Sequence, residues 1–188
     1  MSWPTLVTAV AAAIGSMAAI LAVVVDGRRT RRQLGIENMW RLIDRWDSLD
    51  KTRSAAANHL LVNWAQRDEL SNEAAVLLDS FELLAYLVVR SKTLSLEDTW
   101  VNFSGSAIMW WHCCEPGIRK MQRSDATIYE DYSRLAELLM EEEAKRRHKN
   151  RNELLPSEGD LKQFLSGARM PAQGQVLAQD QDSGNLTG

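Results

Sequence analysis

The chain has 188 residues, of which 45% are hydrophobic, so it can bury one sizeable core but leaves little room for a second domain. Its 22 basic residues nearly balance its 25 acidic ones, giving a net charge of -3, and no nucleic-acid partner is therefore expected. The two cysteines, Cys113 and Cys114, are adjacent and cannot link distant parts of a fold, which excludes a disulfide-stapled scaffold.

Residues 1–27 are predicted to form a transmembrane anchor. No charged residue occurs from Met1 to Val25, and the apolar stretch that begins at Leu6 is about 20 residues long. A helix that rises about 1.5 Å per residue covers roughly 30 Å over that length, which is the thickness of a bilayer's hydrocarbon core. A cleaved signal peptide is the alternative, but it needs a basic start, which is missing here.

A basic juxtamembrane segment, residues 28–35, follows the anchor. Its four arginines are Arg28, Arg29, Arg31 and Arg32, whereas residues 1–5 carry no basic side chain. This asymmetry predicts a single-pass protein of the inner (cytoplasmic) membrane, with its N-terminus outside and the rest of the chain in the cytoplasm. The same arginines could bind anionic headgroups, so membrane lipids are expected partners.

Small residues recur at every fourth position of the predicted anchor, at Ala11, Gly15 and Ala19. On a helix they share one face, where a second helix could approach closely. We therefore expect transmembrane helix packing at these positions, with a homo-oligomer through the anchor as one outcome. Chance spacing in an alanine-rich stretch is the alternative.

Residues 36–149 are predicted to form a cytoplasmic bundle of four or five helices, because apolar residues recur at helical spacing and no strand pattern is sustained. The first helix should run to about Asp47, where Ser48 and Asp50 offer a stop and a new cap. The second helix carries an apolar face at Ala57, Leu60, Leu61 and Trp64.

The third helix has the most regular pattern and begins after a cap at Ser71 or Asn72. Its apolar positions are Ala74, Leu77, Leu78, Phe81, Leu84, Ala85 and Val88. The fourth helix should open at a capping box formed by Ser95 and Asp98. Pro116 and Gly117 are expected to end it.

A fifth helix is predicted to begin near Ser124 or Asp125 and to turn Ile128, Tyr132, Leu135 and Leu139 inward. From residue 150 the composition becomes glycine-rich and poor in aromatics, which predicts a disordered C-terminal tail over 150–188. A short helix over 157–167 could interrupt the tail. Its apolar face of Leu161, Phe164 and Leu165 is a candidate partner-binding surface, and a transient helix without a role is the alternative.

Catalytic motifs are missing from the sequence, and no catalytic residue or cofactor is assigned. The run His112, Cys113, Cys114 and Glu115 is the one cluster of metal-capable side chains, but consecutive helical residues point about 100° apart and cannot all face one ion. A metal site, or a metal- or thiol-based sensor or enzyme, is therefore kept only as an alternative to packing. Glu82, within an apolar helix, is expected to fix helix docking by pairing with an arginine such as Arg53.

The order of these features resembles a bacterial family of membrane-anchored helical proteins known as domain of unknown function 4760. The residues that carry the resemblance are the aromatic and acidic stretch 40–47, Arg53, Phe81 with Glu82, the segment 94–100, Trp110 with Trp111, and the segment 132–135. It covers residues 36–143 and leaves the tail out. It implies an anchored helical protein without an assigned reaction, so no site residues are carried over.

The sequence thus favours a non-enzymatic, membrane-tethered helical interaction or scaffold protein with a protein partner. This interpretation rests on the predicted anchor, on a domain with six tryptophans after residue 36, and on a polar tail. A regulator or effector in a stress or phage-response pathway is a third alternative that the residues do not separate from the first.

Overall fold

The computed structural model describes residues 33–168, and every described element is helical. A helical segment, residues 33–48, leads through a single turn residue into α2 (Asp50–Val62) and the short 3-10 helix η1 (Trp64–Gln66). The remaining elements are α3 (Asn72–Val89), α4 (Leu96–Gln122), α5 (Glu130–Arg147), the 3-10 helix η2 (Arg151–Leu154) and α6 (Glu158–Ala168). The predicted all-α bundle is confirmed.

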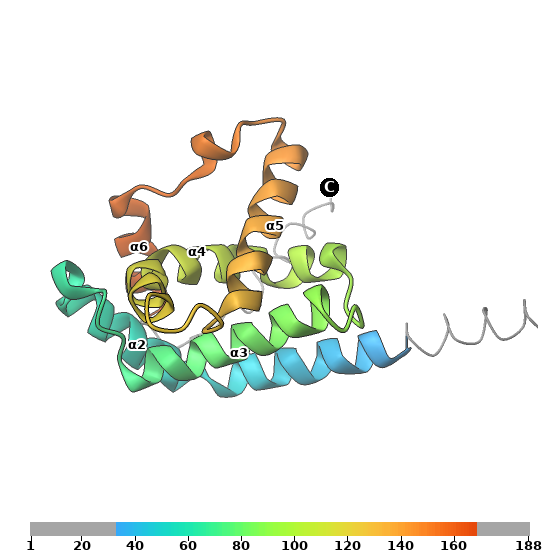
Figure 1. Cartoon of the computed structure of the whole chain (residues 1–188), viewed down its shortest axis with the longest axis horizontal. Coiled ribbons are helices and arrows are strands. Elements are labelled where there is room, and N and C mark those ends of the chain that lie inside the picture. Colours follow the sequence, from blue (N-terminus) through green and yellow to red (C-terminus); the bar gives the residue numbers. More distant parts are fainter. Residues whose placement is uncertain (1–32, 169–188) are drawn as a thin grey trace, which may run out of the picture.

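The helices pack around α3 and α4. Figure 1 shows the segment 33–48 running alongside α3, while α5 stands across both α3 and α4. α6 packs chiefly against α2, with a smaller contact to α4. The prediction of four or five helices for 36–149 is confirmed as five, and α6 adds a further one from the region that was expected to be tail.

A chain of aromatic side chains joins four of these elements in the core. The Phe81 ring of α3 lies 5.0 Å from Trp46 and stacks on Tyr132 of α5 at 4.9 Å. Tyr132 also meets Trp111 of α4 edge-on at 5.5 Å. Its hydroxyl donates a hydrogen bond of 2.6 Å to the carbonyl of Ala107, so the polar end of this fully buried ring is satisfied.

Two of the predicted helix caps are confirmed and one is wrong. The Ser71 and Ser95 hydroxyls accept hydrogen bonds from the backbone N–H groups of Ala74 and Asp98, at 3.2 and 3.0 Å. At the start of α2 the cap residue is Leu49, without a side-chain bond, and the Ser48 hydroxyl instead donates to the Arg45 carbonyl. The preceding helix continues into α2 almost without interruption. Backbone carbonyls therefore accept the hydrogen bonds at the junction, as the Leu49 carbonyl does from the Arg53 N–H.

The fourth helix does not end at Pro116 and Gly117, as the sequence predicted, but continues to Gln122. Proline removes one backbone bond, but the following turn is held by burial, because Gly117 and Ile118 lie in the core. The missing side chain of Gly117 is needed for this packing. A Cβ at that position would lie 2.5 Å from Cγ of Leu70.

The fifth helix begins at Glu130, later than the predicted start at Ser124 or Asp125. Side chains hold residues 124–129 in turns instead, since Asp125 accepts bonds from both the backbone N–H and the hydroxyl of Thr127. Gln122 also donates to the Ile128 carbonyl at 2.8 Å. Tyr129, with a φ of 52°, then makes the sharp entry into the helix.

The prediction of disorder from residue 150 is wrong for residues 151–168. Ser157 and Asp160 form a reciprocal capping box, with the Ser157 backbone N–H donating to Asp160 at 2.8 Å and the Asp160 N–H donating to the Ser157 hydroxyl at 3.2 Å. The short helix expected at 157–167 is confirmed as α6. Residues 169–188 lie outside the described residues.

α6 belongs to the core, which also corrects the prediction that its apolar face is a partner-binding surface. Leu161 and Leu165 are 5% and 0% exposed, and the Phe164 ring meets Trp110 edge-on at 5.7 Å. Ser54 of α2 donates to the Ala168 carbonyl at 3.1 Å and fixes the far end. The predicted apolar face of this helix is confirmed, but it packs against the protein's own α2 and α4.

Leu165→Ala should therefore destabilise the domain by about 2–5 kcal/mol, the usual cost of emptying a fully buried leucine site. Leu155→Ala is the matched control, because that side chain is 49% exposed, and it should change stability by about 0.5 kcal/mol or less. Urea unfolding followed by tryptophan fluorescence measures both. Equal, small effects of the two substitutions would mean that α6 is not docked.

Candidate partner-binding groove

A groove of about 610 Å³ runs between the segment 33–48, the turn after α3 and the start of α4. Its lining residues from the segment 33–48 are apolar, and those from 92–102 are polar apart from Leu94. The lining residues are Gly35, Ile36, Met39, Trp40, Ile43, Lys92, Thr93, Leu94, Ser95, Asp98 and Asn102.

The segment 33–48 contacts the core through buried Leu42 and partly buried Met39, Ile43 and Trp46, whereas Ile36 and Trp40 are exposed. Leu42 is 7% exposed and packs inward, while the next residue, Ile43, points about 100° away along the groove. Ile36, Met39, Trp40 and Ile43, here called the groove stripe, line the groove at spacing i, i+3, i+4, i+7. The Ile36 side chain is 54% exposed and the Trp40 side chain is 63% exposed, so these two residues of the stripe are in contact with solvent.

The opposite wall is positioned by a close backbone contact. Gly35 lies against the Thr93 carbonyl, and a Cβ on Gly35 would come within 2.6 Å of that oxygen. Lys92 has a φ of 52°, which turns the chain back so that Thr93 and Leu94 both donate to the Leu87 carbonyl, at 3.0 and 3.2 Å. The close approach of Gly35 to Thr93 therefore sets how near the two sides of the groove lie at this end.

A second concavity, of about 720 Å³, lies between α2, α4 and α6 and has aromatic walls of Trp46, Trp110 and Phe164. Its ionised groups already have partners in the chain. Arg53 pairs with Asp50 at 2.8 Å and lies over the Trp46 ring at 4.6 Å, while Asp160 serves the cap of α6. The groove beside Trp40 is therefore the better candidate for binding another molecule.

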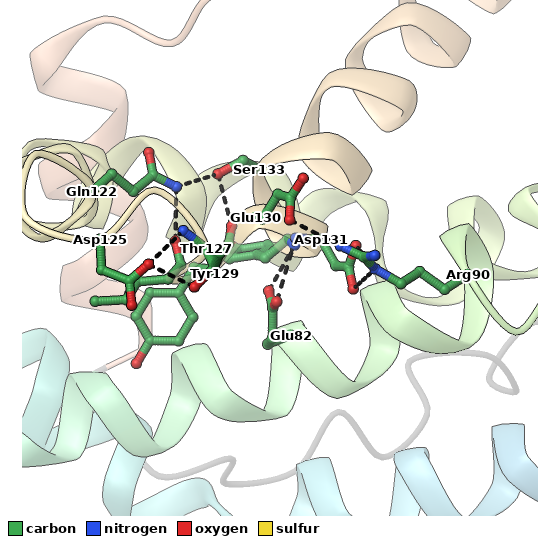
Figure 2. Close-up of polar contacts among 11 residues, drawn as sticks. Glu82, Arg90, Gln122, Asp125, Thr127, Tyr129, Glu130, Asp131 and Ser133 are labelled. Atoms are coloured by element: carbon green, nitrogen blue, oxygen red, sulfur yellow. Dashed lines mark hydrogen bonds and ion pairs between the residues drawn. The ribbon is translucent and has the colours of Figure 1, made fainter.

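Glu82 fixes helix docking, but not through Arg53 as the sequence suggested. Figure 2 shows the Glu82 carboxylate of α3 facing the first turn of α5. It accepts hydrogen bonds from the backbone N–H groups of Asp131 and Tyr132, at 3.3 and 2.8 Å. A carboxylate at a helix N-terminus satisfies N–H groups that have no partner within the helix and is favoured by the helix dipole.

An ion-pair cluster lies beside this cap. Arg90, at the end of α3, donates from Nε to both carboxylate oxygens of Asp131 at 2.7 Å and from Nη2 to Glu130 at 2.9 Å. Asp131 is 8% exposed, so its charge needs this partner. Burial raises the pKa of Glu82 despite the two N–H bonds that favour its ionised form. The cluster therefore docks α5 onto α3. No local pattern around Glu82 indicates which helix end its carboxylate contacts, because that partner lies about 50 residues further along the chain.

The run His112 to Glu115 is not assembled as a metal or redox site. Cys113 and Cys114 are fully buried, and burial raises the pKa of the Cys113 thiol to about 12 and that of Cys114 further. His112 Nδ1 lies 3.9 Å from Glu115, and both are on one helix face as the spacing indicated. Within residues 33–168, no group of three or more His, Cys, Asp or Glu side chains is placed to hold a metal ion.

Other predicted site residues lie outside the described part of the chain. These are the membrane-surface arginines Arg28, Arg29, Arg31 and Arg32 and the packing residues Ala11, Gly15 and Ala19. None of the helices described in residues 33–168 has the length and apolar character needed to cross a membrane. The predicted anchor, residues 1–27, precedes that range.

Comparison with protein-family models, with curated proteins and with solved structures found no match for this chain. The resemblance to domain of unknown function 4760 therefore stays a prediction.

Glu82→Ala should destabilise the domain by about 1–3 kcal/mol, because it leaves two N–H groups at the start of α5 without their acceptor. In the same variant, amide hydrogen exchange at Asp131 and Tyr132 should be faster than in the native protein. Glu141→Ala, which removes an exposed carboxylate of the same helix, is the control and should change little. Unchanged exchange at those two amides would contradict the capping role.

His112 makes stability depend on pH. Burial lowers its pKa from 6.5, so the unfolded chain binds a proton that the folded one resists. The His112 contribution is present above pH 6.5 and is lost as the pH falls through the folded pKa. The free energy of unfolding, measured with urea at several pH values, should fall more steeply with decreasing pH for the native protein than for His112→Gln. Parallel pH profiles would refute this assignment.

Proposed function

We propose that this chain is a membrane-tethered, non-enzymatic helical interaction protein that binds a partner through the groove beside Trp40. The observation that carries the proposal is the groove stripe, because Ile36 and Trp40 expose large apolar surfaces on a helix whose other face is already packed. Exposed apolar patches with a polar rim mark interaction sites. The wall of Lys92, Ser95 and Asp98 supplies such a rim.

The tether rests on the sequence. No charged residue occurs from Met1 to Val25, and four arginines separate this apolar stretch from the segment that carries the groove. In this proposal the protein lies in the inner membrane with the helical domain in the cytoplasm, and lipid headgroups meet the arginines. The groove would then face its partner close to the bilayer surface.

A metal- or thiol-based role is less favoured by the described residues. The two thiols are buried and held protonated by their surroundings, whereas a reactive cysteine needs an accessible thiolate. His112 and Glu115 alone make an incomplete ligand set. A role in a stress or phage-response pathway remains compatible with an interaction protein and adds no different chemistry.

The test uses the full chain at native expression. It should sediment with membranes, resist extraction by high salt and dissolve in detergent. A photoreactive residue at position 36 should form a covalent adduct with another polypeptide, whereas the same residue at position 62, where Val62 is 73% exposed on α2, should not. A soluble chain would contradict the tether, and equal labelling from both positions would contradict the groove.

A further inference from the structure

We propose that η2 and α6, here called the strap (residues 151–168), release from the rest of the bundle when His112 takes up a proton. Figure 1 shows the strap leaving the end of α5 and returning onto α2 and α4. The strap shares no residue with the lining of the groove, so this inference goes beyond the proposed function and does not depend on it. Release uncovers the apolar face of α6 and the Trp110 ring that packs against it.

The strap is held to the bundle mainly by a short apolar face. Leu161 and Leu165 are buried against α2 and α4. Among the described residues, the ion pair that α6 makes joins Lys162 to Glu158 at 2.6 Å, within the helix itself. Residues 151–153 of η2 are exposed. Because a segment held by few buried side chains opens at a lower free energy than a core helix, the strap can open while α3 stays folded.

His112 of α4 is buried with few hydrogen bonds. Its side chain is 14% exposed, and Nε2 is buried without a hydrogen-bond partner among residues 33–168. Nδ1 lies 3.9 Å from the Glu115 carboxylate, which is beyond hydrogen-bond length, and Arg119 lies 3.5 Å from the same carboxylate. A buried polar atom without a partner is costly, and it regains water only if the groups that cover it move.

Charged groups from three elements act on the His112 ring. Glu115 comes from α4 itself, Arg67 from the turn after η1, and Arg151 from η2. The Arg67 guanidinium lies 4.5 Å from the centroid of the Trp64 ring, and its Nη1 is also buried without a partner within the described range. A proton on His112 therefore adds a third cation beside two arginines, and one of these arginines belongs to the strap.

The direction of the pH effect follows from the pKa of His112. Burial is the main cause that lowers this pKa from 6.5; Glu115 raises it, and Arg151 and Arg67 lower it further. Release of the strap gives the ring access to water, where its pKa returns toward the ordinary value. The His112 contribution to docking is therefore complete above pH 6.5 and is lost as the pH falls through the pKa of the docked state.

Amide hydrogen exchange of the full-length protein tests the release, read as protection factors so that the intrinsic pH dependence of exchange cancels. Amides of 161–165 in α6 should be less protected than those of 77–84 in α3, because the strap opens without the core. Their protection should fall several-fold between about pH 7.5 and about pH 5.5, the range in which histidine changes charge. Equal protection of α6 and α3 at both pH values would mean that the strap opens only when the domain unfolds, which overturns the proposal.

Three variants assign the response to His112. His112→Gln removes the titrating ring and should flatten the pH dependence of protection at 161–165. Arg151→Glu changes an exposed side chain of the strap from repelling the protonated ring to attracting it, so it should reduce the response without disturbing the core. His148→Asn is the control, because it removes an exposed histidine at the end of α5 and asparagine tolerates the φ of 52° there.

The control should keep the full response of the native protein. A pH response that persists in His112→Gln, or one that is undiminished in Arg151→Glu, would overturn the proposal. If His112→Gln does not fold, Arg151→Glu and His148→Asn still decide between the two outcomes.

Discussion

The bundle depends on the way one carboxylate of α3 receives the start of α5. Glu82 accepts the N–H groups of Asp131 and Tyr132, and this places the Tyr132 ring on Phe81 and its hydroxyl on the Ala107 carbonyl. One polar contact therefore sets the position of the side chain that joins α3, α4 and α5. Without it, the left-handed entry at Tyr129 would lead into a helix whose first N–H groups face a partly buried space without acceptors.

The same arrangement determines what remains available for function. Phe81 also meets Trp46, so the aromatic chain extends to the segment 33–48 and fixes which of its faces is turned inward. Because Leu42 and Trp46 are committed to the core, Ile36 and Trp40 remain on the outside. The groove is thus a consequence of core packing and of the close approach of Gly35 to Thr93. Its lining lies on helices and on a short turn that are packed against the core, which suits a surface that binds a partner.

Local patterns were sufficient for most helices but not for their connections. The apolar spacing of 74–88 and the serines at 71 and 95 act within one helix, and the structure agrees with them. Pro116, the late start of α5 and the docking of α6 depend on contacts between distant residues, such as Leu70 with Gly117. Composition misrepresented 151–168, because three apolar side chains on one face were enough to dock a short, well-capped helix.

The sequence pattern indicates one side of the candidate site but not the other. The apolar residues from Ile36 to Ile43 recur at helical spacing in the sequence, but the side of the groove from Lys92 to Asn102 comes from a turn whose shape depends on a φ of 52° at Lys92. The most direct measurement is photocrosslinking from position 40 of the full-length protein in native membranes, because Trp40 lines the groove and is 63% exposed. A partner-binding groove predicts a covalent adduct with another polypeptide from this position. Absence of any adduct, from chains shown to be folded and inserted, would contradict it.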